Sequence, residues 1–487
     1  MMGGNDRKSA KKLASQDQLR IRELLDQVLD KCTTMPSGDA KKEWKDFLEV
    51  QKLLQEVRDL EKPLSPNLPK RSNMWPAFLK WCCDNGAYLG SVSIKDLPGG
   101  EYGLIADEQI EESNQFLGVP LKLMMTTATA KKSKLGPLLR DDPIMMNMSN
   151  VALAMFLILE FCAGESSFWH PYISTLPASF NTVLYFSIEE LELLHGSTVL
   201  DEALKLHRSI ARQYSYFHKI FRTHPLAKSL PYKDCFTYDL YRWVAVSAVM
   251  TRQNAVPLTD TAGVEEEDGT DAMTAMVPLW DMCNHSDGKI FTDYDISANM
   301  LRCYAMRDFE KGQEVTIFYG RRTNAEFFIH NGFVFPENRH DSVDIKLGIS
   351  KQDPLYGVKA KLCDDHELTP SGIFALVPRE RPVCDDLSTF LRILVMKDAS
   401  QAASFTDEHI MVATDDNAQQ ALNFLVVRIQ LLLRAFPKSE QEYERIVGDE
   451  GSSGRIKMAA QLRLLEHRIL ATVLETLKQC ANQRAQT

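Results

Sequence analysis

The order of β-prone and helical segments is the feature that most limits the folds open to this chain. Short β-prone runs at 87–94, 103–106 and 116–119 are separated by turn residues, among them a glycine-rich turn at 98–103. Residues 136–255 then carry helical periodicity, and β-prone runs resume at Ala275 and continue to about Leu347. Because short strands need partners to be stable, we expect the two β-rich parts to form one module. The pattern predicts a β-fold interrupted by a helical insertion.

Helical segments lie on both sides of this module. Residues 1–69 hold a basic start, two amphipathic helices with apolar residues three to four positions apart, and a proline-containing linker. Near the other end, 417–436 and 455–481 are helical, and the second carries a leucine-rich stripe. We therefore predict an α+β fold in three parts: a helical extension and linker (1–69), the β-module with its insertion at about 136–255 (70–345), and an all-α C-terminal domain (346–487).

The composition limits the partners. A formal net charge of −10 argues against a surface that binds nucleic-acid phosphates. The ten cysteines include no Cys-x-x-Cys pair, so we expect a reducing compartment, no disulfide framework and no metal site. No apolar run of about 18 residues is visible, so we expect no membrane partner. These observations predict a cytoplasmic protein and are compatible with an additional nuclear pool.

The run 278–285 and the later Tyr319 carry the strongest chemical signal. The run reads Pro-Leu-Trp-Asp-Met-Cys-Asn-His, and Tyr319 follows His285 by 34 residues. A sulfonium cofactor needs polar groups that hold its ammonium and carboxylate ends, and a tight turn with Asn284 and His285 can supply them. Tyr319 ends an apolar run at 315–318 and could place its hydroxyl in a dry channel, where orientation supplies most of the rate.

Each of these two signals alone has an ordinary structural explanation. An Asn-His pair can cap a turn, and Tyr319 can be a half-buried strand residue. Together and in this order they resemble the SET-domain methyltransferases, which use S-adenosylmethionine. The cysteines that bind zinc after the tyrosine in many histone-directed SET enzymes do not follow Tyr319. The interrupted β-fold with a helical domain after it resembles the Rubisco large-subunit methyltransferase group, over about residues 70–480, and that group's last domain is named for substrate binding.

Within that group, four separated runs resemble the SET-domain actin-histidine N-methyltransferase family: 211–214, 250–254, 278–285 and 319–327. The resemblance implies an enzyme that transfers a methyl group from S-adenosylmethionine to the tele nitrogen of a histidine in actin. It implies these cofactor contacts: Arg71, Gly100, Glu101, Tyr102, Arg252, Asp281, Met282, Cys283, Asn284, His285, Asn331, Gly332 and Phe333. It also implies catalytic residues around the target imidazole, Asn254, Trp280 and Tyr319, and three residues along the peptide groove, Arg212, Tyr294 and Arg322.

Three positions depart from the family's pattern. Ile105 stands where the family has arginine in a Gly-Leu-Arg motif, Glu101 follows Gly100 where the family has the acid first, and Asn331 stands where serine is expected. Cofactor contacts made through the backbone would survive these changes. Contacts made through the three side chains would not.

A histidine acceptor also has a physical argument. Making a lysine with a pKa of about 10.4 neutral at pH 7 costs roughly 4.6 kcal/mol, whereas a histidine with a pKa of about 6.5 is already mostly neutral. Histidine instead needs one ring nitrogen held by a hydrogen bond, so that the other presents its lone pair. We hypothesise that Asn254 or Tyr319 fixes this tautomer and that Trp280 packs against the ring. The structural alternatives are a helix C-cap for Asn254 and core packing for Trp280.

Two other functions stay open at this point. The first is a protein-lysine N-methyltransferase, against which the pairing of Asn254 with Trp280 counts. The second, from another class, is a non-catalytic SET adaptor that binds actin; it predicts loss of Tyr319 or of the Asn-His pair, and both are present.

Overall fold

The computed structural model describes residues 13–65, 68, 71–97, 101–257 and 272–484, and the chain divides into two compact units. Unit 1 comprises Met1–Tyr185 and Ala203–Gly320, and unit 2 comprises Phe186–Glu202 and Arg321–Thr487. Both contain helices and strands, so the predicted α+β class is confirmed. The domain boundaries drawn from the sequence stay predictions.

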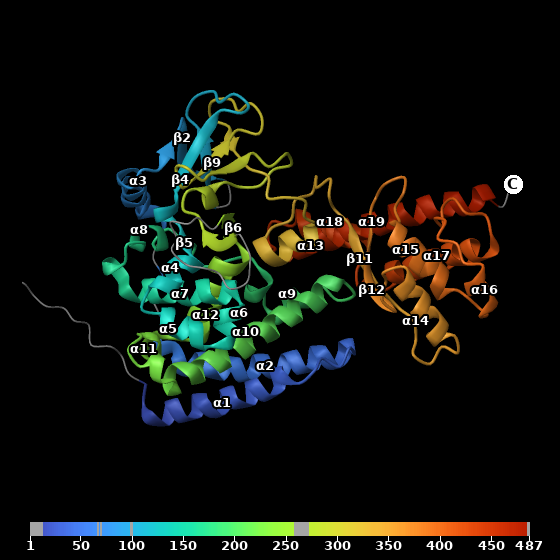
Figure 1. The fold of residues 1–487 in the computed structure, drawn as a ribbon, viewed down its shortest axis with the longest axis horizontal. Coiled ribbons are helices and arrows are strands. Elements are labelled where there is room, and N and C mark those ends of the chain that lie inside the picture. The colour runs from blue at the N-terminus through green and yellow to red at the C-terminus, as the bar shows by residue number, and fades with distance from the viewer. Residues whose placement is uncertain (1–12, 66–67, 69–70, 98–100, 258–271, 485–487) are drawn as a thin grey trace, which may run out of the picture. The chain divides into compact units, whose positions relative to one another are not determined.

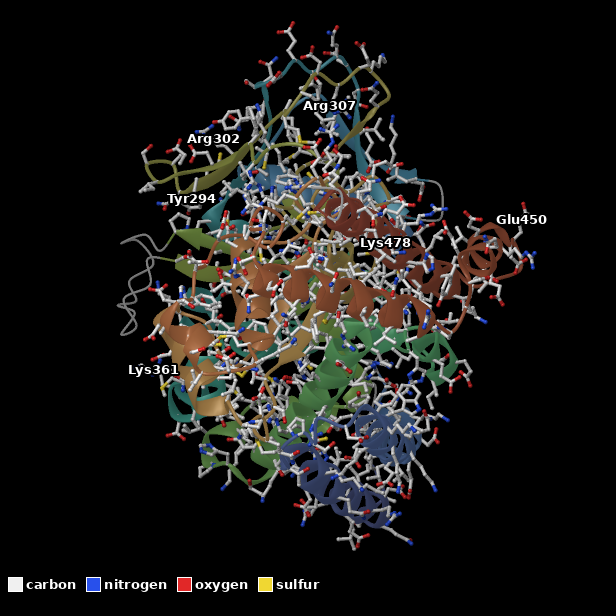
Figure 2. All side chains as sticks on the ribbon, turned by 90° about the vertical axis from the view of Figure 1, so that its right-hand side faces the viewer. Tyr294, Arg302, Arg307, Lys361, Glu450 and Lys478 are labelled. Carbon is white, nitrogen blue, oxygen red and sulfur yellow. The ribbon has the colours of Figure 1, made fainter. Side chains whose placement is uncertain are left out.

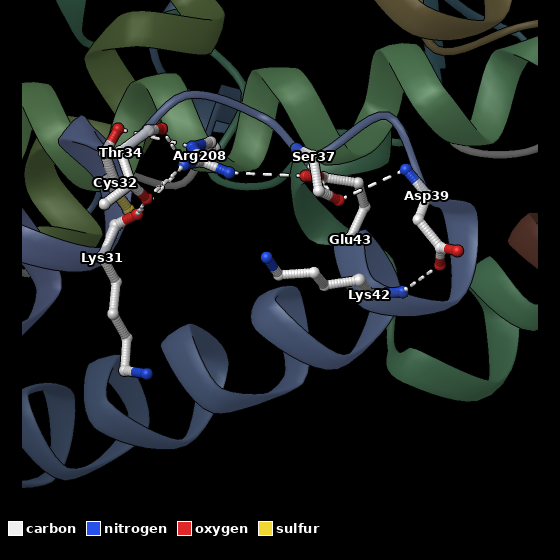
Figure 3. Close-up of polar contacts among 8 residues, drawn as sticks. All are labelled: Lys31, Cys32, Thr34, Ser37, Asp39, Lys42, Glu43 and Arg208. Atoms are coloured by element: carbon white, nitrogen blue, oxygen red, sulfur yellow. Dashed lines mark hydrogen bonds and ion pairs between the residues drawn. The ribbon is translucent and has the colours of Figure 1, made fainter.

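Unit 1 begins with the two predicted amphipathic helices, α1 (Ser15–Thr33) and α2 (Ala40–Glu61), which pack on each other (Figure 1). Figure 3 shows how Arg208 of α10 (Thr198–Thr223) holds the end of α1. Its guanidinium donates to the backbone oxygens of Lys31 at 3.0 Å and Cys32 at 3.3 Å, and to that of Thr34. Because the last carbonyls of a helix lack partners within it, this cation caps α1 and fixes it to the unit.

The strands of unit 1 form three antiparallel sheets, with the orders β1-β4-β9-β8, β10-β3-β2 and β5-β7-β6. The strands are β1 (Tyr88–Leu89), β2 (Val92–Leu97), β3 (Glu101–Ala106), β4 (Gln115–Pro120), β5 (Met125–Thr126), β6 (Gln253–Pro257), β7 (Ala272–Met276), β8 (Thr292–Asp295), β9 (Met300–Tyr304) and β10 (Glu314–Val315). β4 and β9 are paired although the helical segment separates them in sequence. The predicted interruption of one β-module by helices is thereby confirmed.

Side chains also join the strands of the first sheet. Arg302 of β9 donates to Asp295 Oδ2 at 2.9 Å and to Gln115 Oε1 of β4 at 3.0 Å. Figure 2 labels Arg302 and, on the neighbouring strand β8, Tyr294. Because β8 lies at the edge of its sheet, the ion pair at its end helps to fix its register.

The helical part of unit 1 is built around α7 (Ser149–Ala163). Its other helices are α3 (Trp75–Asp84), α4 (Thr127–Lys132), α5 (Gly136–Asp141), α6 (Pro143–Asn147), α8 (His170–Ile173), α10, α11 (Tyr232–Cys235) and α12 (Tyr238–Val244). The segment Ser149–Ser166 is apolar and long enough to cross a membrane by length and composition. However, residues 151–158 are all buried, and α7 packs against α12, α4 and β7. This is the pattern of a core helix.

The predicted helices at 151–161 and 201–222 are confirmed as α7 and α10, while the one at 238–250 has a different second half. After α12, residues Ala245–Met250 form a wide helical turn of the π type. Such turns often occur beside functional sites, because they rotate the residues that follow relative to a regular helix. The chain leaves this turn at Thr251 and enters β6, so Asn254 lies in a strand, opposite Ala275, and the helix C-cap expected as its structural alternative is wrong.

Unit 2 contains α9 (Ile188–Glu192), the start of α10, and every described element after Gly320. Those elements are α13 (Asn324–Glu326), β11 (Val343–Gly348), α14 (Tyr356–Asp365), β12 (Ser371–Leu376), α15 (Asp385–Leu394), α16 (Ser400–Ala403), α17 (Asp416–Arg434), α18 (Glu440–Gly448) and α19 (Gly454–Arg484). The helices predicted at 417–436 and 455–481 are confirmed as α17 and α19.

The C-terminal part is helical but not all-α. β11 pairs with β12 along six residues from Val343↔Leu376 to Gly348↔Ser371, so β11 belongs to a separate two-stranded antiparallel sheet of unit 2, with α14 between its strands, and does not extend the earlier sheets. Its buried face, with Val343, Ile345 and Leu347, joins the core formed by α15, α17 and α19. The sequence prediction missed β12 because its alternation is short and its first two residues are Ser and Gly.

Candidate active site

The candidate site of unit 1 lies at a crossing near Asn284, where two segments of the chain run side by side. Residues 284–286 run beside 316–318: the Ile317 amide donates to the Asn284 carbonyl at 2.9 Å, and the Ser286 amide donates to the Ile317 carbonyl at 3.1 Å. The Asn284 side chain donates to the Tyr102 carbonyl of β3 at 3.2 Å and to Glu314 Oε1 of β10 at 2.7 Å. The Asn284 side chain therefore holds this crossing together, which leaves the backbone around it to line the site.

Tyr319 is fixed at both its backbone and its hydroxyl. Its amide donates to His285 Nδ1 at 3.2 Å, and its hydroxyl donates to the Cys283 carbonyl at 2.7 Å. Since a backbone N–H can only donate, His285 carries its lone pair at Nδ1. Burial, and to a lesser extent Cys283, raise the pKa of Tyr319 above its ordinary value, so the hydroxyl is a neutral phenol at physiological pH. The three predicted residues Cys283, His285 and Tyr319 are thus brought together.

A buried charge cluster lies beside this crossing. Arg252 Nε is 3.2 Å from Asp281 Oδ2, and the Tyr172 hydroxyl of α8 donates to the same oxygen at 2.5 Å. Burial raises the pKa of Asp281, and the charge of Arg252 opposes this. Burial and then Arg252 lower the pKa of Arg71 to about 10, which leaves Arg71 a cation at neutral pH. With Asp281 ionised, two cations face one anion, so the cluster has a net positive charge that suits an anionic ligand group.

Arg71 is held by aromatic rings. Its guanidinium carbon lies 5.3 Å from the centre of the Trp75 ring and 5.0 Å from that of Tyr102, and these two rings are 4.7 Å apart. Its Nη2 is 3.8 Å from Met282 Sδ. The rings orient the cation without neutralising it, because a cation over an aromatic face keeps its full charge.

Several buried polar atoms of this region have no hydrogen-bond partner among the described residues. They are Arg71 Nε, Trp75 Nε1, Trp280 Nε1 and Asp281 Oδ1. A buried donor or acceptor without a partner costs about 1–3 kcal/mol, so such atoms are rarely left unpaired by chance in one small region. Other buried atoms of the described residues also lack partners, but those on residues 71–75 and 280–281 belong to one charge cluster and include both donors and an acceptor, which suits a polar ligand.

Asn254 points its amide nitrogen back to its own strand. Nδ2 donates to the Arg252 carbonyl at 3.1 Å, and because a carbonyl only accepts, the group facing it must be the NH2. The Oδ1 atom is therefore the end of the amide that can accept a hydrogen bond from a ligand. Arg252 itself donates through Nη1 to Thr251 Oγ1 at 2.8 Å, so the short segment 251–254 contributes both a cation and an acceptor.

Of the other predicted residues of unit 1, Tyr102 contacts the cluster. Tyr102 is part of β3 and faces Arg71, whereas Glu101 at the start of β3 is exposed, and Gly100 lies outside the described residues. Arg212 is exposed on α10, and although burial raises the pKa of Cys32 of α1, the charge of Arg212 lowers it. Tyr294 of β8 has a buried hydroxyl that pairs with none of the described residues.

Four predicted site residues belong to unit 2. Arg322 donates through Nη1 to Asn331 Oδ1 at 3.0 Å, and Phe333 stacks on Phe327 with ring centres 4.8 Å apart. Between them, Phe327–Asn331 forms a second π-type turn that ends at Gly332 in the left-handed conformation, with φ 79°. This conformation favours glycine, which explains the residue type at that position.

The sequence analysis did not anticipate Tyr172, Trp75 or Glu314, which hold Asp281, Arg71 and Asn284. Local patterns do not mark Tyr172 and Glu314, because their partners lie 109 and 30 residues away in the sequence. Trp75 acts through its ring, which faces the guanidinium of Arg71. For Trp75, the one signal in the sequence was its position four residues after Arg71, at the start of α3.

Comparisons with known proteins agree with this architecture. The SET domain family model matches residues 101–320, and the Rubisco LSMT substrate-binding model matches residues 350–470. Among solved structures, the SET domain of LSMT bound to lysine and AdoHcy superposes with a TM-score of 0.68, at 20% identity, covering 86% of this chain and 94% of that one. A structure of Rubisco LSMT bound to AdoMet gives the same TM-score and identity. These similarities show the fold.

Curated relatives show the family. The chain is 38% identical over 468 residues to an actin-histidine N-methyltransferase of Callithrix jacchus, and 39% identical over 468 residues to that of Homo sapiens. In both cases the alignment covers 94% of this chain and 77% of the relative. At this identity and coverage, and with a SET fold around the residues predicted from the four sequence runs, the chain belongs to the actin-histidine N-methyltransferase family of SET-domain proteins.

Proposed function

We propose that this protein transfers a methyl group from S-adenosylmethionine to the tele nitrogen of a histidine side chain in actin. The observation that carries the proposal is the group of unpaired buried polar atoms around Arg71, Trp280 and Asp281, beside the fixed hydroxyl of Tyr319. The names of the relatives give the acceptor and the protein substrate.

The residues of unit 1 fit this cofactor. When bound, S-adenosylmethionine supplies an electrophilic methyl group on a sulfonium. The net positive cluster of Arg71, Arg252 and Asp281 would hold its carboxylate, and the unpaired Asp281 Oδ1 would accept from its ammonium. The backbone of 281–285 supplies further groups at the crossing, since the Asn284 and His285 side chains are engaged within the protein.

The acceptor end of the site suits an imidazole. Asn254 Oδ1 would accept the N–H of the pros nitrogen, which leaves the tele nitrogen with its lone pair. Trp280 would pack against the ring, and its unpaired Nε1–H could donate to the substrate backbone. Tyr319 stays neutral and donates to the Cys283 carbonyl, so it positions the acceptor without charging it. No strong base is required, because histidine is already mostly neutral at pH 7.

We further propose that the protein binds actin and is cytoplasmic. Tyr294 and Arg322 would contact the actin segment around the histidine, as the family resemblance implies. Tyr294 supports this role with a buried hydroxyl that pairs with none of the described side chains. Arg212 lies on α10, near Cys32 of α1, and this position favours a contact with parts of the substrate that are more distant from the histidine.

The decisive experiment is incubation of the protein with labelled S-adenosylmethionine and purified actin, followed by mapping of the label by mass spectrometry. The proposal expects tele-methylhistidine at one site. Label on lysine would instead make the protein a lysine methyltransferase, and binding of actin without transfer would make it an adaptor.

A matched pair of variants tests the role of Asn254. Asn254→Phe removes the acceptor for the ring N–H, so histidine methylation should fall roughly tenfold or more, and methylation of a lysine placed at the same peptide position should rise. The control is Gln253→Phe, because successive residues of β6 point to opposite faces and Gln253 is exposed. Unchanged histidine activity in Asn254→Phe would remove Asn254 from the site.

A further inference from the structure

Two cysteines far apart in the sequence meet at the side of unit 1. Cys162 lies in the last turn of α7 and Cys235 is the last residue of α11, 73 positions later. Their sulfur atoms are 2.6 Å apart. Non-bonded heavy atoms normally rest roughly 3.5–4.0 Å apart, and a disulfide bond measures about 2.05 Å. The two sulfurs are therefore far inside contact distance and close to bonding distance.

The surrounding contacts hold the two helix ends in this position. Tyr232 of α11 is fully buried and donates through its hydroxyl to the Met155 carbonyl of α7 at 2.8 Å. Its ring stacks on Phe221 of α10 with centres 4.2 Å apart. Beside Cys162, the ring of Phe161 packs on Trp243 of α12 at 5.4 Å. Because α7 and α11 are anchored on both sides of the pair, a bond between the sulfurs requires only a small local shift.

The pair is also reachable from solvent. Both side chains are half-buried, unlike Cys32, Cys82 and Cys283, which are buried. This partial exposure gives a small oxidant access to the pair.

We propose that Cys162 and Cys235 are a reversible redox pair that forms an intramolecular disulfide with a low-molecular-weight disulfide such as oxidised glutathione as the oxidant. One protein thiolate attacks a glutathione sulfur, and one glutathione leaves as its thiolate. The second protein thiolate then attacks the cysteine sulfur of the mixed disulfide, the protein S–S bond forms, and the second glutathione leaves as its thiolate. Two cysteine thiols are oxidised, one glutathione disulfide is reduced to two thiols, and the two thiol protons pass to solvent or to the leaving thiolates.

The bond would close the chain segment between the end of α7 and the end of α11, including most of the helical insertion. α11 leads directly into α12 and the wide turn Ala245–Met250, which delivers Arg252 and Asn254 to the site. The oxidised form should therefore unfold at a higher temperature than the reduced form, because closing a long loop reduces the entropy of the unfolded chain.

The test oxidises the full chain with glutathione disulfide under native conditions, blocks free thiols with N-ethylmaleimide, and maps cysteines by mass spectrometry. We expect a peptide cross-linked through Cys162 and Cys235, two hydrogens lighter than the sum of its parts and cleaved by dithiothreitol. We also expect a rise of the thermal midpoint on the order of 5 °C.

Variants separate this pair from the exposed cysteines. Cys83→Ser, which changes an exposed cysteine of the same unit, should retain both the cross-link and the thermal shift, whereas Cys235→Ser should lose both and trap glutathione on Cys162. Recovery of both Cys162 and Cys235 as blocked free thiols in the oxidised wild-type chain would overturn the proposal. So would separate glutathione adducts on the two cysteines without a bond between them. The mapping needs only the wild-type chain, so it remains decisive if a variant fails to fold.

Discussion

Glu61, the last residue of α2, should make the stability of unit 1 depend on pH. Its side chain is only 3% exposed, the Tyr214 hydroxyl donates to Oε1, and the Tyr238 amide donates to Oε2 at 2.8 Å. Burial raises the pKa of Glu61 from 4.5 to about 7, although these two hydrogen bonds lower it. Glu61 ties α2 to α10 and to the start of α12, so its charge state affects how firmly the N-terminal helices are attached.

The size and sign of the effect follow from this pKa. The difference between about 7 in the folded chain and 4.5 in the unfolded chain is about 2.5 units, and each unit corresponds to about 1.36 kcal/mol. A raised pKa means that the protonated acid is the form that suits the fold. Its contribution is fully present below pH 4.5, is lost as the pH rises toward 7, and then stays lost, for a total of about 3 kcal/mol.

Glu61→Gln isolates this contribution, because the amide mimics the protonated acid at every pH. The free energy of unfolding of the variant minus that of the wild type should rise by about 3 kcal/mol between pH 4.5 and 7.5. Urea unfolding followed by circular dichroism at a series of pH values measures this difference. The matched control is Glu56→Gln on the same helix, where an exposed pair with Arg20 should give a nearly constant difference. A difference for Glu61→Gln that is flat or falls with pH would refute the reasoning.

Three further predictions concern the site. Tyr319→Phe removes the hydroxyl bonded to the Cys283 carbonyl, so the rate constant of methyl transfer in single-turnover assays should fall on the order of 100-fold, with little change in cofactor affinity by calorimetry. An unchanged rate constant would exclude Tyr319 from catalysis. Arg71→Leu should weaken S-adenosylmethionine binding by about 10–100-fold in the same calorimetry, and equal affinity would move the carboxylate site elsewhere. Gly332→Ala should lower the free energy of unfolding of the chain by about 1–2 kcal/mol, because φ is 79°, and a neutral effect in urea unfolding would argue against that conformation.

The secondary structure was largely predictable from local patterns. The amphipathic spacing in α1, α2 and α19 records which face of each helix is buried, and this is a property of short windows of sequence. The prediction was wrong where the backbone is neither a regular α-helix nor a regular strand. The π-type turn Ala245–Met250 has the same apolar residues as a helix, and only its hydrogen bonds distinguish it, so Asn254 was expected as a possible cap and lies in β6.

The sequence predicted which residues of 278–319 lie together, but not the contacts that their side chains make. The run 278–285 and Tyr319 were recognisable because a short turn and one strand end carry them, and 281–285 does lie at the crossing with 316–319. The sequence could not show that the Asn284 and His285 side chains bond to Glu314 and to the Tyr319 amide.

By itself, the sequence determined the α+β class, the helical insertion and the family. Only the tertiary structure decided which charges meet. Arg71, Tyr172, Arg252 and Asp281 come from four distant segments, and their cluster exists because a buried charge must find partners wherever folding brings them together. The meeting of Cys162 with Cys235 has the same origin: local periodicity records which side of a segment is buried, while the identity of the neighbour across the core is set by the packing of whole elements.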